Sequence, residues 1–564
     1  MNKASILRQI LRKVCADTSA PRSPSRRRFL GRAGGMAIAT VMASVVGTPA
    51  RALAERATVE DPHAGLTNTQ ERRLQAYRIR HQAAIFQRDL PLPEHRSNGD
   101  DTLYPNRIGS FSKGLPHNAL GEVDPQAYNG LLRALSAGQP DGFETLAMGG
   151  NSKLRNPQAM YAFDLMGPDP HHLGMPAPPA FSSAEQAAEM AELYWHALTR
   201  DVPFTDYATD PLISRAADEL SRLAGFHGPK VDGKVTATTL FRGAANGNLY
   251  GPYLSQFLWV DVRQGAMLIP QRIRTVTPKI DYMVEYSSWL LAQNGSLAYA
   301  NQFDSTPRYI RNGRDLGEYV HLDFSYQAFL NACLILLDTR AELAGSNPYR
   351  YSLTEDGFGT FGAPHVLDMV AKAANCALKA AWYQKWAVHR RPRPEAFGGA
   401  VHLHKTGGAQ YPVHEDTLSL PVLDTIFKRH GSYLLPMAYV EGSPFHPAYP
   451  SGHASMAGAC VTMLKAFFNE NYVILAPVIA SADGLKLNRY VGPELTVGGE
   501  LNKLAANIAI GRDWAGVHWR SDAIEGMQLG EAVAIGILAD AKACFNEQVS
   551  GFSLTLFDGT PITI

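Results

Sequence analysis

Apolar side chains recur at helical spacing over most of the chain that follows residue 181. A capping box, Ser182-Ser183-Ala184-Glu185, precedes the amphipathic segment EQAAEMAELYWHAL and predicts the start of a helix. Similar spacing predicts further helices over 281–293, 321–344, 364–389, 452–470, 497–511 and 521–545. Alternation typical of strands is scarce and predicts only short strands, over 256–262 and 552–557. The pattern indicates a mostly α fold of antiparallel helical bundles, which we expect to be two four-helix bundles.

The chain before residue 181 has a different composition. Residues 55–180 are rich in Pro, Gly, Asn and His and contain few long periodic stretches. We therefore predict an irregular N-terminal region wrapped on the core, followed by a helical-bundle region over 181–564. A length of 564 residues with 45% hydrophobic content is enough to bury a large core.

The N-terminus carries the pattern of an export signal. The sequence SRRRFL, residues 25–30, precedes an apolar stretch over 34–46 and then the small-residue site Ala52-Leu53-Ala54. This order predicts a twin-arginine signal peptide over 1–54, with cleavage after Ala54. A membrane anchor is the alternative, but the apolar stretch is shorter than the roughly 20 residues that a span needs. We expect a periplasmic or secreted protein without a membrane span in its mature chain.

Removal of this signal changes the charge of the chain. It takes away ten basic residues and one acidic residue, which leaves 43 basic and 51 acidic residues and a net charge of about −8. Nucleic-acid binding is not expected, since it usually requires a basic surface. Four cysteines remain after residue 54: Cys333, Cys376, Cys460 and Cys544. They are widely spaced among apolar neighbours and fit no zinc pattern. We expect them to be buried thiols, although an exported protein could join some of them in disulfides.

The segment KWAVHRRPRPEAFGG, residues 385–399, concentrates basic side chains at the end of a predicted helix. Lys385 and His389 are four residues apart and would share one helix face. Pro392 and Pro394 would then force an extended turn that carries Arg393. Alone, the segment favours a solvated helix end whose cations complement the helix dipole.

Two further segments are suited to an anion. In HPAYPSGHASM, residues 446–456, Ser451 and Gly452 fall where a helix begins, and such an end offers unpaired N–H groups and a partial positive charge. Ordinary helix capping is the alternative. In GRDWAGVHWRSD, residues 511–522, Arg512 and His518 follow an apolar helix. Together the three segments supply the donors and the histidines that a tetrahedral or trigonal-bipyramidal oxyanion needs: Lys385, Arg393, Ser451, Gly452, His453, Arg512 and His518.

The three blocks K-W-x-V-H-R-x-x-R-P-E, H-P-x-Y-P-S-G-H and G-R-x-x-x-G-V-H resemble the active site of vanadium-dependent haloperoxidases, and most closely the bromoperoxidases of marine algae. That family belongs to one superfamily with the type 2 phosphatidic acid phosphatases. The resemblance extends over about residues 200–545 and makes the helical region catalytic. It implies orthovanadate as the cofactor, with His518 coordinating vanadium and five residues holding the equatorial oxygens: Lys385, Arg393, Ser451, Gly452 and Arg512.

The resemblance also implies roles for neighbouring residues. His453 would move protons beside the apical oxygen, and Lys385 would polarise bound peroxide. Trp382 and His446 would lie near the halide and tune its choice. Asp323, expected on a helix, would be a buried carboxylate that orients an active-site arginine, with Glu318 and Asp513 as alternatives. His389 is expected to pack at the helix end or to support Lys385.

The implied reaction is the oxidation of bromide and iodide by hydrogen peroxide to hypohalous acid, which halogenates small organic acceptors, with poor chloride turnover. The alternative enzyme is an acid phosphatase in which His518 attacks phosphorus in the same site and His453 protonates the leaving alcohol. A further alternative is a non-catalytic, exported oxyanion-binding protein, but binding alone would not explain a histidine at position 453 beside so many basic side chains. Relatives suggest a homo-oligomer.

Overall fold

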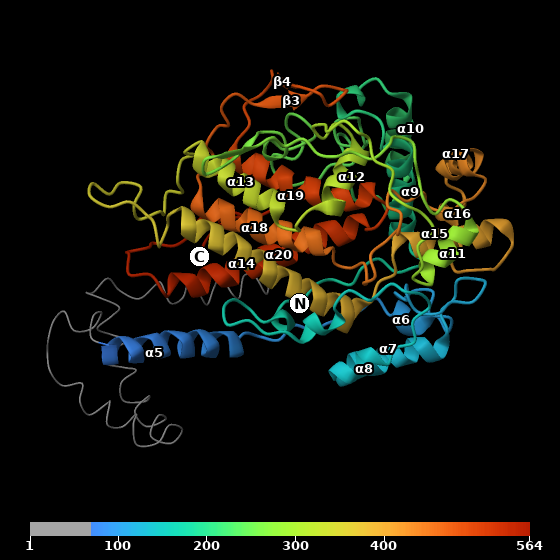
Figure 1. The fold of residues 1–564 in the computed structure, drawn as a ribbon, viewed down its shortest axis with the longest axis horizontal. Coiled ribbons are helices and arrows are strands. Elements are labelled where there is room, and N and C mark those ends of the chain that lie inside the picture. Colours follow the sequence, from blue (N-terminus) through green and yellow to red (C-terminus); the bar gives the residue numbers. More distant parts are fainter. Residues whose placement is uncertain (1–68) are drawn as a thin grey trace. The chain divides into compact units, whose positions relative to one another are not determined.

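The computed structural model describes residues 69–564 (Figure 1). The predicted signal peptide and its cleavage site lie outside the described residues. The described chain divides into two units. One consists of residues 69–91, with helix α5 (Thr69–Arg88), together with 539–544 and 564, and the other consists of 92–538 and 545–563. The remainder of the fold concerns the larger unit.

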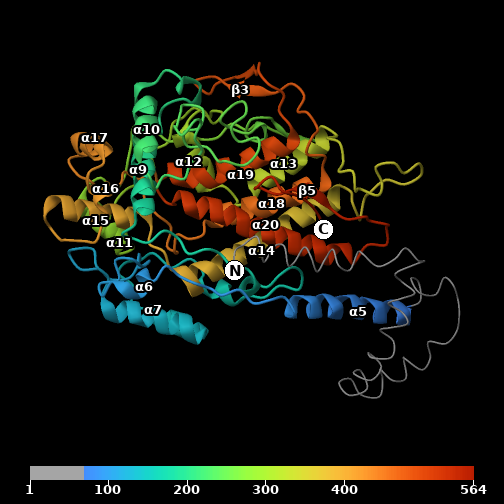
Figure 2. The ribbon, with the colours of Figure 1, turned by 180° about the vertical axis from the view of Figure 1, so that it is seen from behind.

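Long helices form the centre of the larger unit. Helix α18 (Gly452–Phe467) packs between α14 (Ala363–Tyr383) and α19 (Val497–Trp514), and these helices lie side by side in both views (Figure 1, Figure 2). Helix α20 (Arg520–Lys542) approaches α18 closely because both helices carry glycines at the contact; a side chain at Gly458 or Gly530 would run into the backbone of the opposite helix. Helices α12 (Gly313–Leu322) and α13 (Gln327–Asp338) both pack on α19.

A second group of helices surrounds α9 (Ala184–Thr199), which contacts α19. Its neighbours are α10 (Pro211–Arg222), α16 (Glu415–Leu418) and α17 (Pro421–His430), while α11 (Tyr286–Gln293) packs on α15 (Pro394–Thr406). The N-terminal part adds α6 (Asp100–Leu103), α7 (Pro125–Ala137) and α8 (Pro140–Glu144). The predicted mostly α fold is confirmed; the division into two four-helix bundles stays a prediction.

Short elements complete the larger unit. Three antiparallel strand pairs are present in the described chain: β1 (Val262–Gln264) with β2 (Met267–Ile269), β3 (Val478–Ala480) with β4 (Leu487–Arg489), and β5 (Ser553–Thr555) with β6 (Pro561–Thr563). Single 3-10 turns occur as η1 (Pro157–Tyr161), η2 (Pro170–His172), η3 (Phe204–Asp206) and η4 (Gln256–Leu258). A π-helical turn, η5 (Gln384–His389), follows α14 directly.

Several predicted boundaries need correction. The cap of α9 is Ser183, one residue later than the predicted box, and its hydroxyl accepts the Gln186 N–H at 3.1 Å. The single helix predicted over 321–344 is wrong, because the chain leaves α12 at Asp323, which is extended, and begins α13 only at Gln327. The strand predicted over 256–262 is wrong for most of its length, since 256–258 is η4. The strand predicted over 552–557 is confirmed as β5.

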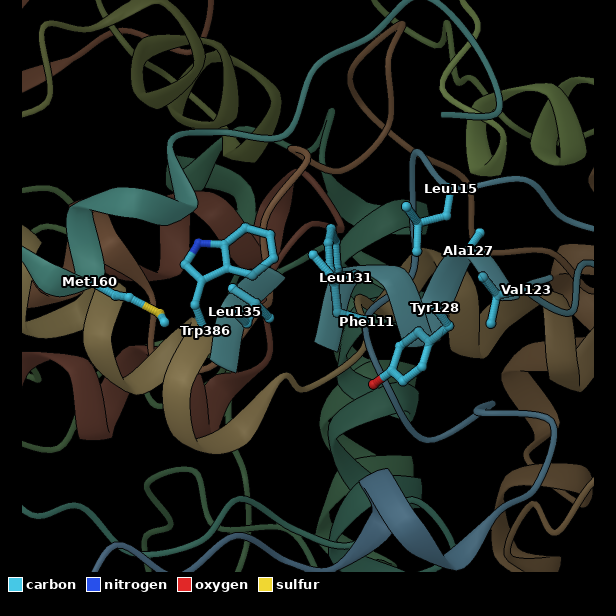
Figure 3. Packing of buried hydrophobic residues seen from close by; sticks show 9 residues of the cluster. All are labelled: Phe111, Leu115, Val123, Ala127, Tyr128, Leu131, Leu135, Met160 and Trp386. Atoms are coloured by element: carbon cyan, nitrogen blue, oxygen red, sulfur yellow. The ribbon is translucent and has the colours of Figure 1, made fainter. Parts of the chain in front are cut away.

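The predicted irregular region contributes an apolar cluster to the larger unit. In Figure 3, the indole of Trp386 in η5 lies between Met160 on one side and Leu135, Leu131 and Phe111 on the other, and the rest of the cluster extends away from it. Phe111 meets that indole edge to face, with ring centroids 5.7 Å apart. An ion pair between Arg390 and Asp101, at 2.6 Å, joins the same two parts of the chain. Residues 101–160 therefore hold the π-helical turn that carries Lys385.

The cysteines follow the prediction only in part. Cys333 and Cys460 are buried thiols, whereas Cys376 is half-buried and Cys544 is exposed, so the prediction is wrong for Cys544. No single helix among residues 69–564 has the length and apolarity of a membrane span; α12 and α13 reach them only as a pair bent by 97°.

Candidate active site

The three predicted segments meet at the ends of helices. Lys385 lies in η5, Ser451 caps α18, and Arg512 and His518 lie in and just after the last turn of α19. Arg393 is the cap residue of α15 and links all three segments, because its guanidinium donates to the carbonyl oxygens of His446 at 2.9 Å and Val517 at 2.6 Å. We call this group of residues the cradle: Lys385, Arg393, Ser451, Gly452, Arg512 and His518.

Lys385 is completely buried, which is unusual for a lysine. Its ammonium donates to the carbonyl oxygens of Pro447 at 2.6 Å and Ala448 at 2.9 Å. A π-helical turn shifts side chains relative to an α-helix, and such turns are frequent at functional sites. Burial, reinforced by the nearby charge of Arg393, holds the pKa of Lys385 well below its usual value. An anion in the cradle would favour the charged form.

His518 is oriented by a carboxylate. Its Nδ1 lies 2.8 Å from Asp522 Oδ2, which can only accept, so Nδ1 carries the proton. The lone pair of Nε2 therefore points toward Arg393, whose NH1 lies 3.0 Å away. Burial first, and then the positive charges of Arg393 and Lys385, lower the pKa of His518 well below its usual value. His518 is thus a neutral imidazole whose Nε2 lone pair accepts from Arg393 and could instead bind a ligand atom.

Asp522 is a site residue that our sequence reasoning did not identify. One of its oxygens accepts from His518 and from the Trp519 N–H at 3.0 Å, while the other accepts from Arg391 at 2.8 Å. Its backbone carbonyl accepts the Ser451 N–H at 3.0 Å, which joins the second and third segments. The signal was present in the sequence, since an acid four residues after a histidine at a helix start shares its face.

Arg512 is a buried member of the cradle. Its NH1 donates to the Val320 carbonyl at 2.6 Å and to the Tyr439 hydroxyl at 3.3 Å. Its Nε is buried and has no hydrogen-bond partner among residues 69–564. An unsatisfied buried donor costs about 1–3 kcal/mol, more when charged, so an acceptor that binds to this atom would remove that cost.

Ser451 and Gly452 provide the helix end that was predicted. The Ser451 hydroxyl accepts the Ala454 N–H at 3.4 Å, which leaves its own hydrogen available for donation. Gly452 is the first residue of α18. A Cβ at Gly452 would lie 3.1 Å from the Trp382 ring and 3.2 Å from Leu378, so a side chain there would crowd the same space. Glycine keeps the helix end open.

His453 lies at the edge of the site, with 18% of its side chain exposed. Its Nε2 is 2.9 Å from Asp323 Oδ1. Two expectations for Asp323 are therefore corrected: it follows a helix instead of lying on it, and it contacts His453 and not an arginine. The alternatives Glu318 and Asp513 do not take that place, because Glu318 binds His321 at 3.2 Å and Asp513 has an oxygen without a partner in the described chain.

The two residues expected near the halide lie together. The rings of Trp382 and His446 are 4.8 Å apart, and the Lys385 ammonium is 5.8 Å from the Trp382 ring centre. His446 is buried, and Arg393 NH2 is 3.0 Å from its Nδ1. His389 lies apart from this pair: its ring packs on Tyr449 at 4.8 Å, and neither ring nitrogen has a partner in the part of the chain described. This fits the expected packing role.

These groups suit a tetrahedral or five-coordinate oxyanion. The cradle offers the unsatisfied Arg512 Nε, the Ser451 hydroxyl, the helix end at Gly452 and one ligand atom, His518 Nε2. Among residues 69–564, no cluster of three or more His, Cys, Asp or Glu side chains could hold a bare metal cation. Buried cations around a single imidazole are instead the donor set that vanadate or phosphate requires.

Known proteins resemble the chain along most of its length. The family model for the second helical-bundle domain of VCPO matches residues 422–547. Vanadium-dependent bromoperoxidases of Corallina officinalis and Corallina pilulifera are each 37% identical over 567 residues, covering 83% of this chain and 94% of theirs. The vanadium-dependent bromoperoxidase of Ascophyllum nodosum is 36% identical over 83% of this chain and 88% of its own.

One solved structure agrees with the sequence relatives. The homohexameric second vanadate-dependent bromoperoxidase of Ascophyllum nodosum has a TM-score of 0.84 and 30% sequence identity, covering 90% of this chain and 91% of that one. The predicted resemblance is confirmed, and the chain belongs to the vanadium-dependent bromoperoxidase family.

Proposed function

We propose that this protein oxidises bromide and iodide with hydrogen peroxide, using vanadate held in the cradle, and that the hypohalous acid formed halogenates small organic acceptors. The observation that carries the proposal is the arrangement around His518. A neutral imidazole whose Nε2 lone pair is fixed by Asp522 faces buried arginine and lysine side chains. Vanadate, when bound, supplies a Lewis acid of constant oxidation state that activates peroxide.

The chain's own residues hold the cofactor and transfer the proton. His518 Nε2 anchors the cofactor, and the cationic side chains with the Ser451 hydroxyl and the Gly452 N–H neutralise its oxygens. His453, at the solvent edge, accepts and returns the proton of peroxide through its ring. Burial would raise the pKa of Asp323, but the imidazole of His453, its hydrogen bond and the charge of Arg512 hold it below its usual value. An ionised Asp323 keeps His453 oriented.

The halide is expected between Trp382, His446 and Lys385. A ring face and a buried ammonium lie together here, and Arg393 holds His446 in place. Burial, then Arg393 and Lys385, lower the pKa of His446 well below its usual value, so the ring is neutral in the free protein. A soft halide is accommodated by such a partly aromatic site more readily than chloride. We therefore propose the order iodide and bromide well above chloride.

The test is reconstitution of the apo-protein with vanadate, followed by addition of peroxide and each halide in turn. Bromination of a phenolic dye that requires both vanadate and peroxide, with chloride at least about tenfold slower, a difference of about 1.4 kcal/mol, is the expected result. Hydrolysis of a phosphate ester, inhibited by vanadate and without bromination, would instead establish the phosphatase alternative.

We also propose a homo-oligomer, supported by the homohexameric relative from Ascophyllum nodosum. Light scattering of the purified protein measures the assembly directly. A mass of one chain at micromolar concentration would refute the proposal.

Export through the twin-arginine pathway is proposed from the sequence of residues 25–54. N-terminal sequencing of the protein recovered from a periplasmic or culture fraction should begin at Glu55. Replacement of Arg26 and Arg27 by lysine should retain the full-length chain inside the cell. Recovery of the processed protein from that variant would exclude the twin-arginine route.

A further inference from the structure

Arg512 rests on an aromatic platform that the proposed chemistry does not use. Its guanidinium carbon lies 5.3 Å from the ring centre of Tyr439, and its NH1 donates to the Tyr439 hydroxyl. That hydroxyl itself donates to the Gly317 carbonyl at 2.6 Å, so the ring is fixed to α12. Tyr439 is 1% exposed, so the residues packed around it confine its ring.

A histidine supports this ring. The imidazole of His321 stacks on Tyr439 with ring centres 3.8 Å apart and planes inclined by only 8°. Its Nε2 lies 2.8 Å from Glu441, and its Nδ1 lies 3.2 Å from Glu318. Burial opposes a charge at this position, but the hydrogen bonds to these two carboxylates raise the pKa of His321 to about 9. A charged ring stacked on tyrosine is favourable through the quadrupole of the phenol ring.

A series of contacts connects Glu441 with residues on the opposite side of the cradle. The Glu441 carbonyl accepts from the Lys113 ammonium at 2.7 Å, and Lys113 pairs with Glu395 at 2.6 Å. Glu395 lies two residues after Arg393 and also accepts from Gln293 at 2.7 Å. A chain of contacts therefore runs beneath the site from one cradle arginine to the neighbourhood of the other.

We propose that His321 and Tyr439 are positioning residues that hold Arg512 with its free Nε directed at the oxyanion, and that Glu441 and Glu318 hold His321 in turn. Neither positioning residue belongs to the cradle, so each acts only through Arg512. A guanidinium has many rotamers, and fixing it before the anion arrives removes that entropy cost from binding. This inference rests on the proposed function, since it assumes that vanadate occupies the cradle.

The test measures vanadate affinity of the apo-protein by equilibrium dialysis, without any turnover. His321→Gln keeps a hydrogen bond to Glu441 but removes the charge and the stacked ring. We expect its Kd for vanadate to rise by about tenfold, the lower end of the range for residues that orient metal ligands. His430→Gln, at the end of α17 beside Asp281, is the matched control and should bind like the parent.

A double-mutant cycle separates positioning from general packing. In an Arg512→Lys background, the effect of His321→Gln should shrink to less than about twofold, because the group on which it acts is gone. An equal loss in both backgrounds, or no loss in either, would overturn the inference. If the parent itself does not bind vanadate, the proposed function fails instead.

Folding of each variant is followed by circular dichroism and thermal melting. Should His321→Gln fail to fold, Tyr439→Phe decides the question, since it keeps the ring and removes only the hydroxyl between Arg512 and Gly317. A rise in Kd of about threefold or more that disappears in the Arg512→Lys background supports the proposal, because the variant removes one hydrogen bond that holds the guanidinium. An unchanged Kd contradicts it.

Discussion

Replacement of His518 by alanine should abolish vanadate-dependent bromination while leaving a folded protein. The change removes Nε2, the atom of His518 that faces Arg393 and the cradle. Arg393 keeps its hydrogen bonds to Val517 and His446, and Asp522 keeps Arg391 and the Trp519 N–H, so the surrounding network survives. Loss of a direct ligand should raise the Kd for vanadate by at least about 100-fold, beyond the 10–100-fold range for residues that only support a ligand.

Equilibrium dialysis with vanadate and a dye bromination assay make the measurement, and His227→Ala on an exposed loop is the control. Retained bromination in His518→Ala would show that vanadium is held by another group. A phosphate ester assay on the same variant tests the alternative enzyme, because the loss of a nucleophilic His518 would stop hydrolysis as well.

The cradle could be predicted from sequence because its residues lie in three short blocks with fixed internal spacing. Each block ends or begins a helix, and helix ends carry local signals such as the Ser451 cap and the prolines after His389. The apolar periodicity predicted helices over 364–389, 452–470 and 497–511, and these ranges begin within one residue of α14, α18 and α19. The three blocks could be assigned to a single site because their basic side chains and histidines together suit the binding of one oxyanion.

The rest depended on contacts that no local pattern reports. An apolar repeat continues across Asp323, yet α12 ends before it, and the carboxylate of Asp323 contacts His453, 130 residues away. Tyr439 and His321 meet only in the fold, and the packing of α7 around Trp386 involves residues predicted to be irregular. Tertiary contacts of this kind override local propensity, and one sequence contains no record of them.

Asp522→Asn should weaken vanadate binding nearly as much as a direct change to the cradle. An asparagine has one acceptor and one donor where the aspartate has two acceptors. If the amide nitrogen faces His518, it donates to Nδ1, moves the ring proton to Nε2 and destroys the ligand lone pair, while also opposing the Trp519 N–H. If it faces Arg391 instead, two donors meet in a fully buried site. Both orientations are unfavourable, so no rotation of the amide repairs the change.

We expect the Kd for vanadate to rise by about 10–100-fold and the free energy of unfolding to fall by about 2–4 kcal/mol, because the buried Arg391 loses one of its two carboxylate partners and keeps Glu189, Gln186 and the Ser521 hydroxyl. The 15N shifts of the His518 ring report the tautomer directly and should show the proton at Nε2 in at least part of the population. Asp218→Asn, exposed on α10, is the matched control. Since the carboxylate acts on the cofactor only through the ring, a variant whose 15N shifts place the proton at Nε2 and which still binds vanadate as tightly as the parent would mean that Nε2 is not the anchoring atom. The assignment of His518 would then have to be abandoned together with that of Asp522.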